Sequence, residues 1–353
     1  MEEISYSSSI DLLSNLIKTP SYSGEEEKTA TIIKDWLRKF NINANQFKNN
    51  IWVTNKFFDV NKPTILLNSH HDTVKPNEGY TTNPFEPTVI DGKLYGLGSN
   101  DAGASLVSLM HLFIHFYEMK NLKYNLLFSA TAEEEISGAN GIACLLDEIP
   151  PIDFAVVGEP TEMHLAVAEK GLLVLDCFSN GISGHAAHEN TDNAIYHALD
   201  DINWIRDYTF PKTSELLGKV KMSVTQINAG SQHNVVPAGC HFVVDVRVNE
   251  CYQNKEVFDI INKNTKSRVE ARSFKLNSSF INIDHPIVIA GKSLGRKIIG
   301  SSTISDQALL KCPSIKMGPG KSSRSHTANE FVELKEIEEG IELYIKIFNQ
   351  LLK

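Results

Sequence analysis

The feature that most constrains the fold of this chain is a series of short apolar runs separated by segments of helical periodicity. Three such runs, at residues 64–69, 125–130 and 153–157, are bounded by polar or turn-forming residues. Runs of this length are typical of buried strands rather than helices. Because they alternate with helical segments over roughly the first 160 residues, we expect an α/β fold with a mostly parallel sheet flanked by helices.

The pattern changes near residue 170 and predicts a second domain inserted into the first. Strand-like and helical segments follow in the order β-α-β-β-α-β, at residues 171–178, 193–208, 220–227, 241–248, 255–264 and 269–274. This order is the split β-α-β arrangement of α+β domains. We expect a first domain of residues 1–168 and 282–353, closed by an amphipathic C-terminal helix, and an inserted domain of residues 169–281. A chain of 353 residues also suggests two domains at roughly 150 residues each.

Composition argues against several classes of function. The chain has 34 Lys and Arg against 43 Asp and Glu, a net charge of −9, which disfavours nucleic acid and anionic membranes as partners. Its five cysteines are odd in number and include no Cys-x-x-Cys pair, so neither a disulfide framework nor a structural zinc site of thiolates is expected. The sequence shows no basic, apolar leader and no run of about 18 apolar residues, and we expect a cytoplasmic protein.

A helix is predicted to begin after Ser23. Ser23 and Glu26 match the S-x-x-E capping box, in which each side chain accepts a hydrogen bond from the other residue's backbone N–H. Ile33, Leu37 and Phe40 follow on one helical face.

Histidine and acidic residues stand directly after the predicted strands. His70 and Asp72 follow the run at 64–69. Because alternate residues of a strand share a face, His70 can bind a metal while the Asp72 carboxylate holds the other ring nitrogen. An isolated histidine is more often structural or solvated, so this pair alone is a weak signal.

Two further strands are followed by glutamates. Glu133, Glu134 and Glu135 come after the run at 125–130, and Glu159 comes after the run at 153–157. Three adjacent carboxylates repel one another unless a cation or solvent relieves the repulsion. Most such triplets are solvated, but the carboxyl ends of parallel strands meet at one sheet edge, so Glu134 and Glu135 are expected beside His70.

Two glycine-rich segments resemble phosphate-binding loops but depart from both motifs. A dinucleotide-binding G-x-G-x-x-G motif at residues 96–101 would need glycine where Asp101 stands, and a P-loop would need glycine where Ile315 stands. We expect instead a turn that presents Asp101, with capping of a helix at 102–113 as the alternative role. The second segment is expected to form a turn that delivers His326.

Together these residues form a candidate ligand set of two imidazoles and three carboxylates: His70, Asp101, Glu135, Glu159 and His326. This number of donors suits two divalent ions. Nitrogen and oxygen donors without thiolate fit zinc, cobalt or manganese. A bridging carboxylate and a shared water would hold the ions ~3.5 to 4 Å apart, as in two-metal hydrolases.

In this order, the motifs resemble those of the dinuclear zinc amidohydrolases, the family that includes acetylornithine deacetylase, succinyl-diaminopimelate desuccinylase, aminoacylase and carboxypeptidase G. The resemblance spans nearly the whole chain. It is carried by Ser69-His70-His71-Asp72, Gly98-Ser99-Asn100-Asp101, Glu134-Glu135-Ile136-Ser137-Gly138, Gly158-Glu159-Pro160-Thr161, Gly184-His185, Asn234-Val235-Val236-Pro237 with Arg247, and His326-Thr327-Ala328-Asn329-Glu330.

The resemblance implies a division of the ligands between two metal sites. Asp101 would bridge the metals, with His70 and Glu159 completing one site and Glu135 and His326 completing the other. Family members commonly carry Asp-x-Lys-Gly after the bridging position, whereas this chain reads Asp101-Ala102-Gly103-Ala104 and lacks the lysine.

The resemblance also implies roles for residues outside the ligand set. Glu134 would be the general base that takes a proton from the attacking water and passes it to the departing amine. His185 would donate to the oxyanion from the inserted domain, often across a homodimer formed through that domain. Asn234 and Arg247 are candidate substrate-binding residues. Arg247 could clamp a substrate carboxylate, or it could form an ordinary ion pair on a strand face.

The expected function is hydrolysis of an N-acyl amino acid, with N2-acetyl-ornithine or N2-succinyl-ornithine first, in arginine biosynthesis. The alternatives are a dipeptidase, tripeptidase or carboxypeptidase with the same site, or a deacylase of acetyl-citrulline, of carrier-linked lysine or ornithine, or of succinyl-diaminopimelate. In the resemblance to desuccinylases of diaminopimelate, the sequence expected at the start of the inserted domain is Arg-Arg-Gly. This chain has Glu169-Lys170-Gly171 there, which disfavours succinyl-diaminopimelate as the substrate. A further alternative is a catalytically silent metal-binding or scaffolding relative, and Glu134 beside the five candidate ligands argues against it because a protein that only binds needs no base.

Overall fold

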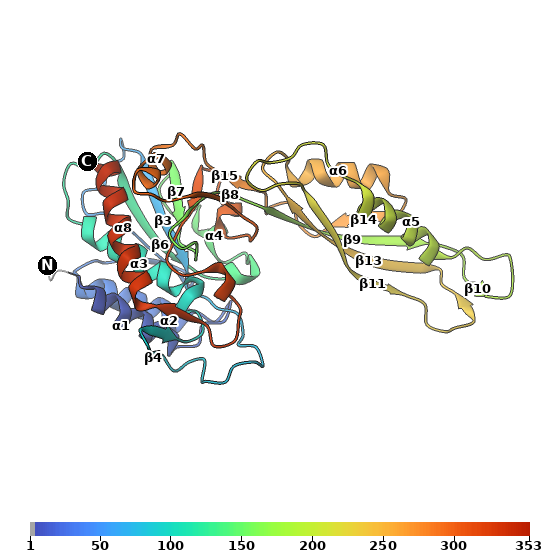
Figure 1. Cartoon of the computed structure of the whole chain (residues 1–353), viewed down its shortest axis with the longest axis horizontal. Coiled ribbons are helices and arrows are strands. Elements are labelled where there is room, and N and C mark those ends of the chain that lie inside the picture. The colour runs from blue at the N-terminus through green and yellow to red at the C-terminus, as the bar shows by residue number, and fades with distance from the viewer. Residues whose placement is uncertain (1–3) are drawn as a thin grey trace. The chain divides into compact units, whose positions relative to one another are not determined.

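The computed structural model describes residues 4–353, which form two compact units (Figure 1). The first unit comprises the chain up to Val167 with Phe280–Ile299 and Ser305–Lys353, and the inserted unit comprises Ala168–Ser279 with Gly300–Ile304. These bounds lie within two residues of the expected ones except at Gly300–Ile304, which was expected in the first domain. This segment joins the inserted unit because its backbone pairs there, where the Lys170 N–H donates to the Ser301 carbonyl at 3.0 Å.

The first unit is built on a sheet whose central strands are parallel. Its strand order is β1-β2-β6-β3-β7-β17-β8-β15, and β16 pairs with β8. The strands are β1 (Asn45–Phe47), β2 (Asn50–Thr54), β3 (Thr64–His70), β6 (Asn125–Thr131), β7 (Phe154–Val157), β8 (Leu165–Glu169), β15 (Ser279–Phe280), β16 (Ile298–Ser301) and β17 (Ser314–Lys316). The neighbours β6, β3, β7 and β17 run parallel, while β2 and β8 join them antiparallel. The predicted α/β class with a mostly parallel sheet is confirmed.

Every residue of β3 and β6 is buried because side chains cover both faces of the sheet. Ile65 and Leu67 face a large core that also contains residues of the flanking helices, whereas Leu66 faces a smaller core that includes Ile142. The helices of this unit are α1 (Tyr6–Ile17), α2 (Glu27–Lys39), α3 (Ala104–Phe116), α4 (Ile142–Leu145), α7 (Pro286–Ser293) and α8 (Leu334–Leu352). None of the helices within residues 4–353 is long and apolar enough to cross a bilayer.

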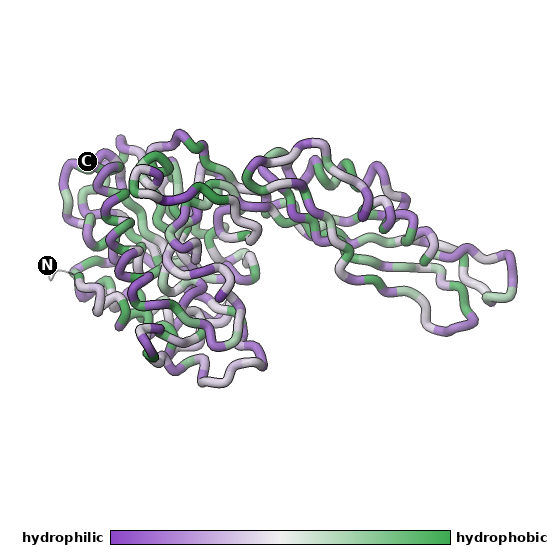
Figure 2. Tube along the Cα trace, in the orientation of Figure 1, coloured by the Kyte–Doolittle hydropathy of each residue, from purple (hydrophilic) through white to green (hydrophobic). Residues whose placement is uncertain are grey.

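The C-terminal helix α8 closes the first unit as its periodicity predicts. Ile337, Ile341 and Tyr344 are fully buried on its inner face, and the alternation of polar and apolar residues along it is visible in Figure 2. The Tyr344 hydroxyl donates to the Met317 carbonyl, which ties the helix to the end of β17.

The capping box predicted at Ser23 and Glu26 is wrong. Helix α2 begins at Glu27, and no side chain caps it. The Ser23 hydroxyl donates to Asp72 Oδ2 at 2.7 Å, and the Glu26 carboxylate accepts from the Gly24 and Glu133 N–H groups. Tertiary partners replace the local cap because Glu26 is fully buried and needs donors from the segments around it.

The inserted unit has the predicted β-α-β-β-α-β order. Its elements are β9 (Gly171–Asn180), α5 (Ala194–Asp207), β11 (Lys221–Ala229), β13 (Gly239–Val248), α6 (Asn254–Asn264) and β14 (Arg268–Ala271). The strands form an antiparallel sheet in the order β11-β13-β9-β14. Alternate residues of β9, such as Leu173 and Leu175, pack with apolar residues of both helices. A separate short ladder joins β10 (Gly184–His185) to β12 (Val235–Val236) and was not predicted.

A small antiparallel sheet in the first unit was also not predicted. It joins β18 (Phe331–Glu333), β5 (Lys93–Tyr95) and β4 (Thr88–Ile90) in that order. Phe331 pairs with Tyr95, so the segment that follows β5 runs beside the segment that precedes β18. These two segments carry Asp101 and His326.

Candidate metal centre

The expected ligands converge at the carboxyl edge of the parallel sheet. His70 is the last residue of β3, Glu135 follows β6 and Glu159 follows β7, and these three strands are neighbours. Parallel strands end at the same sheet edge, so their terminal side chains meet. Asp101 arrives from the turn at Ser99–Gly103, which leads into α3, and His326 arrives from the loop between β17 and β18.

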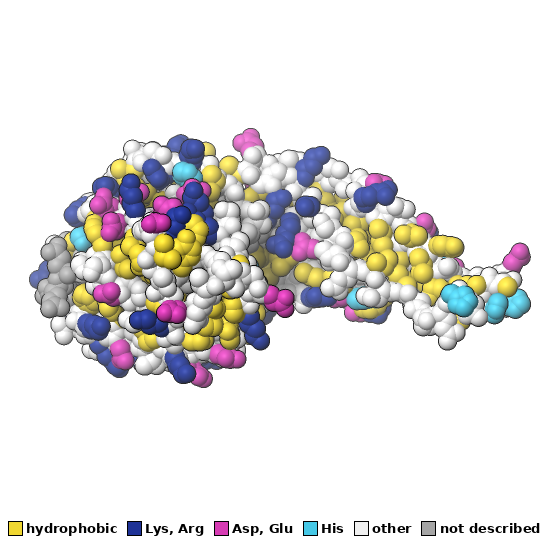
Figure 3. All heavy atoms as spheres, turned by 60° about the horizontal axis from the view of Figure 1, so that its bottom comes forward, with side chains coloured by type: hydrophobic (Ala, Val, Ile, Leu, Met, Phe, Trp, Pro, Cys, Tyr) yellow, Lys and Arg dark blue, Asp and Glu magenta, His cyan; other side chains and the backbone are white. Residues whose placement is uncertain are grey.

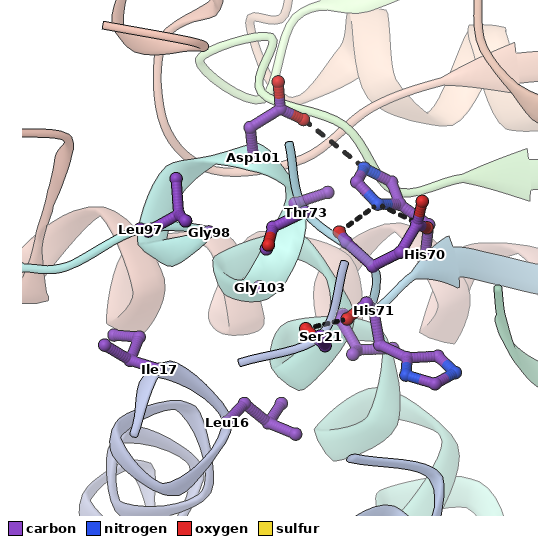
Figure 4. A pocket seen from close by; sticks show the side chains of 13 residues that line it. Leu16, Ile17, Ser21, His70, His71, Thr73, Leu97, Gly98, Asp101 and Gly103 are labelled. Atoms are coloured by element: carbon purple, nitrogen blue, oxygen red, sulfur yellow. Dashed lines mark hydrogen bonds and ion pairs between the residues drawn. The ribbon is translucent and has the colours of Figure 1, made fainter. Parts of the chain in front are cut away.

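One group of donors consists of His70, Asp101 and Glu159, whose ligand atoms all lie within 4.8 Å of one another. His70 Nε2 is 3.4 Å from Asp101 Oδ1 and 3.8 Å from Glu159 Oε1. Figure 4 shows the Asp101 carboxylate directed at this ring. His70 is 1% exposed, so the group is closed to bulk water on the side of the sheet.

A second group consists of Asp101, Glu135 and His326, again with ligand atoms within 4.8 Å of one another. His326 Nε2 is 3.0 Å from Glu135 Oε2 and 3.6 Å from Asp101 Oδ2. Asp101 therefore directs one carboxylate oxygen at His70 and the other at His326. This is the disposition of a bridging ligand.

The donor separations suit cation binding. Four ligand atoms 2.0–2.2 Å from a zinc ion in tetrahedral geometry lie roughly 3.3–3.6 Å apart, close to the distances between the imidazole nitrogens and the carboxylate oxygens. All five donors are nitrogen or carboxylate oxygen, the set that divalent first-row metals and zinc accept. The residues thus fit a pair of divalent ions with small adjustments.

The pKa shifts of the buried side chains at the site also favour cation binding. Burial, joined by repulsion from Asp101, raises the pKa of Glu159 to about 8, and burial together with neighbouring carboxylates raises the pKa of Glu134 well above its usual value. Burial lowers the pKa of His70, but the surrounding carboxylates, Glu134 foremost, outweigh it and raise that pKa well above its usual value. Buried carboxylates this close together are costly when ionised unless cations compensate them.

Asp72 holds the turn that follows β6. Its Oδ1 and Oδ2 accept from the backbone N–H groups of Glu134 and Glu135, each at 3.1 Å. Asp72 Oδ1 also lies 3.4 Å from His70 Nδ1, but the Asp72 backbone carbonyl is closer, at 3.0 Å. Strand β3 ends at His70, yet the Asp72 carboxylate still lies beside the second ring nitrogen of His70, and the same carboxylate also orients the two glutamates.

The three adjacent glutamates have different surroundings. Glu133 points away from the donors, because its carboxylate accepts from the backbone and side-chain amides of Asn140. Glu134 Oε2 lies 3.9 Å from His70 Nε2 but belongs to neither donor group. Glu133 and Ser137, on either side of the short turn Glu134–Ile136, have φ values of 55° and 47°, so the backbone is in the left-handed conformation at both ends of this turn.

Three predicted site residues belong to the inserted unit, and the roles assigned to them stay predictions. His185 is exposed in β10, and its Nδ1 accepts from the Ala187 N–H at 3.1 Å. Asn234 is exposed, and its carbonyl accepts from the Ala186 N–H, so it lies beside His185. Arg247 on β13 makes two hydrogen bonds to the Asp245 carboxylate, at 2.9 and 3.1 Å, which is the strand-face ion pair considered above.

Two buried carboxylates near the donors were missed by the sequence reasoning. Asp306 accepts from the Asn68 side chain at 2.8 Å and from the Thr131 hydroxyl at 2.7 Å, just behind the strand ends. Burial raises the pKa of Asp306 to about 6. Asn68 is a polar residue inside an apolar strand, and this signal could have indicated a buried polar partner. The second is Glu330, which ends the His326-to-Glu330 motif but received no role.

A pocket of about 230 Å³ lies beside the second donor group. It is lined by His326 and by residues of the loop after β3, including the apolar Val74 and Pro76 and the polar Lys75 and Asn77. A much smaller cavity of about 20 Å³ lies under His70 and Asp101 (Figure 4) and has room for about one water molecule. Space for one end of a small substrate is therefore present next to His326.

Comparison with known proteins gives the family. Residues 66–350 match the sequence profile of Peptidase family M20/M25/M40. The chain is 27% identical to the acetylornithine deacetylase of Proteus mirabilis (strain HI4320) over 365 residues, covering 95% of this chain and 94% of that protein. It is 25% identical to the acetylornithine deacetylase of Shigella sonnei (strain Ss046) over 378 residues, covering 96% and 97%.

Solved structures share the fold over nearly the whole chain. A tripeptidase of Staphylococcus aureus subsp. aureus Mu50 has a TM-score of 0.79 at 20% identity, with 99% of each chain covered. The Bacillus subtilis YXEP protein, a dinuclear metal-binding peptidase, has a TM-score of 0.72 at 17% identity, with 97% of each chain covered. The chain belongs to Peptidase family M20/M25/M40 and is a metallo-hydrolase.

Proposed function

We propose that this protein is a two-metal amidohydrolase that releases a free amino acid from an N-acyl amino acid. N2-acetyl-ornithine and N2-succinyl-ornithine are the first candidate substrates, which would place the enzyme in cytoplasmic arginine biosynthesis. The observation that carries the proposal is the placement of Asp101, whose two oxygens lie 3.4 Å from His70 and 3.6 Å from His326. The similarity to acetylornithine deacetylases supports the choice of substrate.

The two donor groups are proposed to hold two divalent ions, zinc first, with cobalt or manganese as alternatives. His70, Asp101 and Glu159 would hold one ion, and Asp101, Glu135 and His326 the other. Such ions, when bound, polarise the scissile carbonyl and lower the pKa of the attacking water toward ~7.

Glu134 is proposed as the general base. Its carboxylate lies 3.9 Å from His70 Nε2 and is not part of either donor group. The turn that carries Glu134 is held by the Asp72 carboxylate, which accepts from the Glu134 and Glu135 N–H groups. Held there, Glu134 can accept a proton from the attacking water and then donate it to the departing amine nitrogen.

The inserted unit is proposed to complete the site and to form a homodimer. His185 would donate to the developing oxyanion, and Asn234 and Arg247 would bind the substrate, for which Arg247 must exchange Asp245 for a substrate carboxylate. Hydrophobic side chains gather on part of this unit's surface (Figure 3). Tyr196, Leu199 and the edge-strand residue Ile227 are 68%, 43% and 50% exposed, which favours association with a second copy.

A substrate panel tests the proposal. Zinc- and cobalt-loaded protein should be assayed with N2-acetyl-ornithine, N2-succinyl-ornithine, N-acetyl-citrulline, succinyl-diaminopimelate, lysine or ornithine linked to a carrier peptide, and a tripeptide. We expect kcat/KM for an N2-acyl-ornithine to exceed that for every other compound by at least tenfold, since buried polar recognition discriminates strongly between substrates.

The second candidate function is that of a tripeptidase or carboxypeptidase. The fold similarity to a tripeptidase of Staphylococcus aureus favours it. A tripeptide turned over faster than both acyl-ornithines would reverse the ranking of the two functions, and the absence of turnover with every amide would reject both.

A further inference from the structure

Glu330 is a buried carboxylate aimed at the backbone of the turn that carries Asp101. Its Oε1 accepts from the Asn100 and Asp101 N–H groups, both at 2.8 Å, and its Oε2 accepts from the Gly98 N–H at 3.1 Å. The residue is 2% exposed. One side chain thus satisfies three backbone donors of a single turn.

The small sheet places Glu330 at this turn. Phe331 pairs with Tyr95, and the Gly96 N–H donates to the Glu330 carbonyl at 3.0 Å. The backbone of Glu330 is therefore held against the start of the same turn that its side chain binds. Because His326 precedes Glu330 by only four residues, the loop that supplies one imidazole also fixes the shared carboxylate.

Other contacts leave the turn little freedom. The Asn100 side chain donates to the Lys321 carbonyl at 3.0 Å and accepts from the Lys321 N–H at 2.9 Å. Gly98 has a φ of 75°, and a Cβ there would come within 2.6 Å of Thr73 Cγ2. The Glu330 carboxylate accepts directly from the Asp101 N–H. A shift of the Glu330 carboxylate therefore moves the backbone of the same residue whose side chain is the shared carboxylate.

We propose that Glu330 is a positioning residue that sets the place of Asp101 between the two donor groups and thereby the affinity of both for divalent cations. This inference rests on the proposed two-metal function. Groups that orient metal ligands from behind typically change metal affinity or activity by roughly 10–100-fold when they are removed. Since both donor groups share Asp101, the loss should affect both ions.

The test is a zinc titration of metal-stripped protein, with affinity and stoichiometry measured by calorimetry against a competing chelator. Glu330→Gln keeps the size of the side chain but turns an amide NH2 toward at least one of the three N–H donors. We expect its zinc affinity to fall at least tenfold at both sites, and its activity to recover in part at saturating zinc. The melting temperature of the metal-free form should be recorded in parallel.

Asp201 provides a matched control. It is 3% exposed and accepts from the Lys266 N–H, the Ser267 N–H and the Ser267 hydroxyl, all within the inserted unit. Asp201→Asn therefore also replaces a buried carboxylate that has three donors, but this carboxylate belongs to the inserted unit, which contains no proposed metal ligand. We expect a lower melting temperature with unchanged zinc affinity. If Glu330→Gln does not fold, Glu330→Asp replaces it, and the same loss of affinity is expected.

The outcomes separate the two proposals. A folded Glu330 variant that binds two zinc ions with wild-type affinity overturns the positioning role and leaves the metal site intact. Wild-type protein that binds no pair of zinc, cobalt or manganese ions overturns the proposed function itself. A loss of affinity in Asp201→Asn equal to that in the Glu330 variant shows a general effect of stability and also rejects the positioning role.

Discussion

At the scale of single residues, neighbours of the same type take different roles in this site. His70 faces the donor groups, while His71 is buried behind them, within hydrogen-bond distance of Thr29 Oγ1 and of the Asn49 carbonyl. Burial lowers the pKa of His71 to about 4, so it stays neutral and structural. In the same way, Glu134 lies near the donor groups, whereas the Glu133 carboxylate contacts Asn140. Residue type therefore predicts which residues can act, but backbone direction decides which of them does.

Glu134→Gln should reduce kcat by roughly 100- to 10,000-fold, the usual contribution of a positioned general base. The variant should still bind two zinc ions, because Glu134 belongs to neither donor group. Steady-state kinetics and metal analysis measure the two quantities. Glu133→Gln is the matched control, since its carboxylate contacts Asn140 instead of the donors, and it should keep most of its activity. Full turnover by Glu134→Gln would refute the assignment of the base.

At the scale of elements, most candidate ligands lie in turns and loops that follow the strands, and glycines allow two of these segments to approach each other closely. Gly320, with a φ of 89°, lies where a Cβ would come within 2.4 Å of Asn100 Oδ1. A side chain at this position would push the loop of His326 away from the turn of Asp101. The sequence signal for both turns was a cluster of glycines, which predicts a bend but not its partner.

Gly98→Ala should destabilise the protein more than Gly92→Ala. Both glycines have φ near 75°, a conformation that costs an L-residue about 1–2 kcal/mol. Only at Gly98 would the new Cβ also meet a neighbour, Thr73 Cγ2, at 2.6 Å, whereas nothing lies within 4 Å of Gly92. Denaturant unfolding of the metal-free proteins measures the difference. Equal losses of unfolding free energy in the two variants would show that the crowding at Gly98 relaxes freely.

At the scale of the whole molecule, all proposed metal ligands belong to one of the two units. The donor groups lie within the first unit, and the inserted unit has its own core around Leu173, Phe242 and Val257. Metal binding to the folded state alone stabilises by about 4 kcal/mol at a free concentration 1,000-fold above Kd. This stabilisation should be confined to the unit that holds the ligands.

Removal of metal by chelation should abolish activity and increase amide hydrogen exchange in the first unit, most at the ends of β3 and β6 and at the Asp101 turn. Exchange in β9 and β13 of the inserted unit should change little, because neither strand carries a proposed ligand. Mass spectrometry of peptides from the stripped and the zinc-loaded protein compares the two units. An equal increase in both units would contradict local stabilisation by metal.

The sequence by itself determined the main elements and the residue types of the candidate ligands. Local apolar runs predict buried parallel strands, and the polar residues that follow these strands must meet at one sheet edge because parallel strands end together. The tertiary structure alone decided the rest. Ser23 binds Asp72 instead of forming the expected helix cap with Glu26. The two Asp101 oxygens lie near different imidazoles, and Glu330 accepts from the backbone of the Asp101 turn. These contacts join residues far apart in the chain, and they depend on distances that exist only after the strands, the small sheet and the turns have packed against one another.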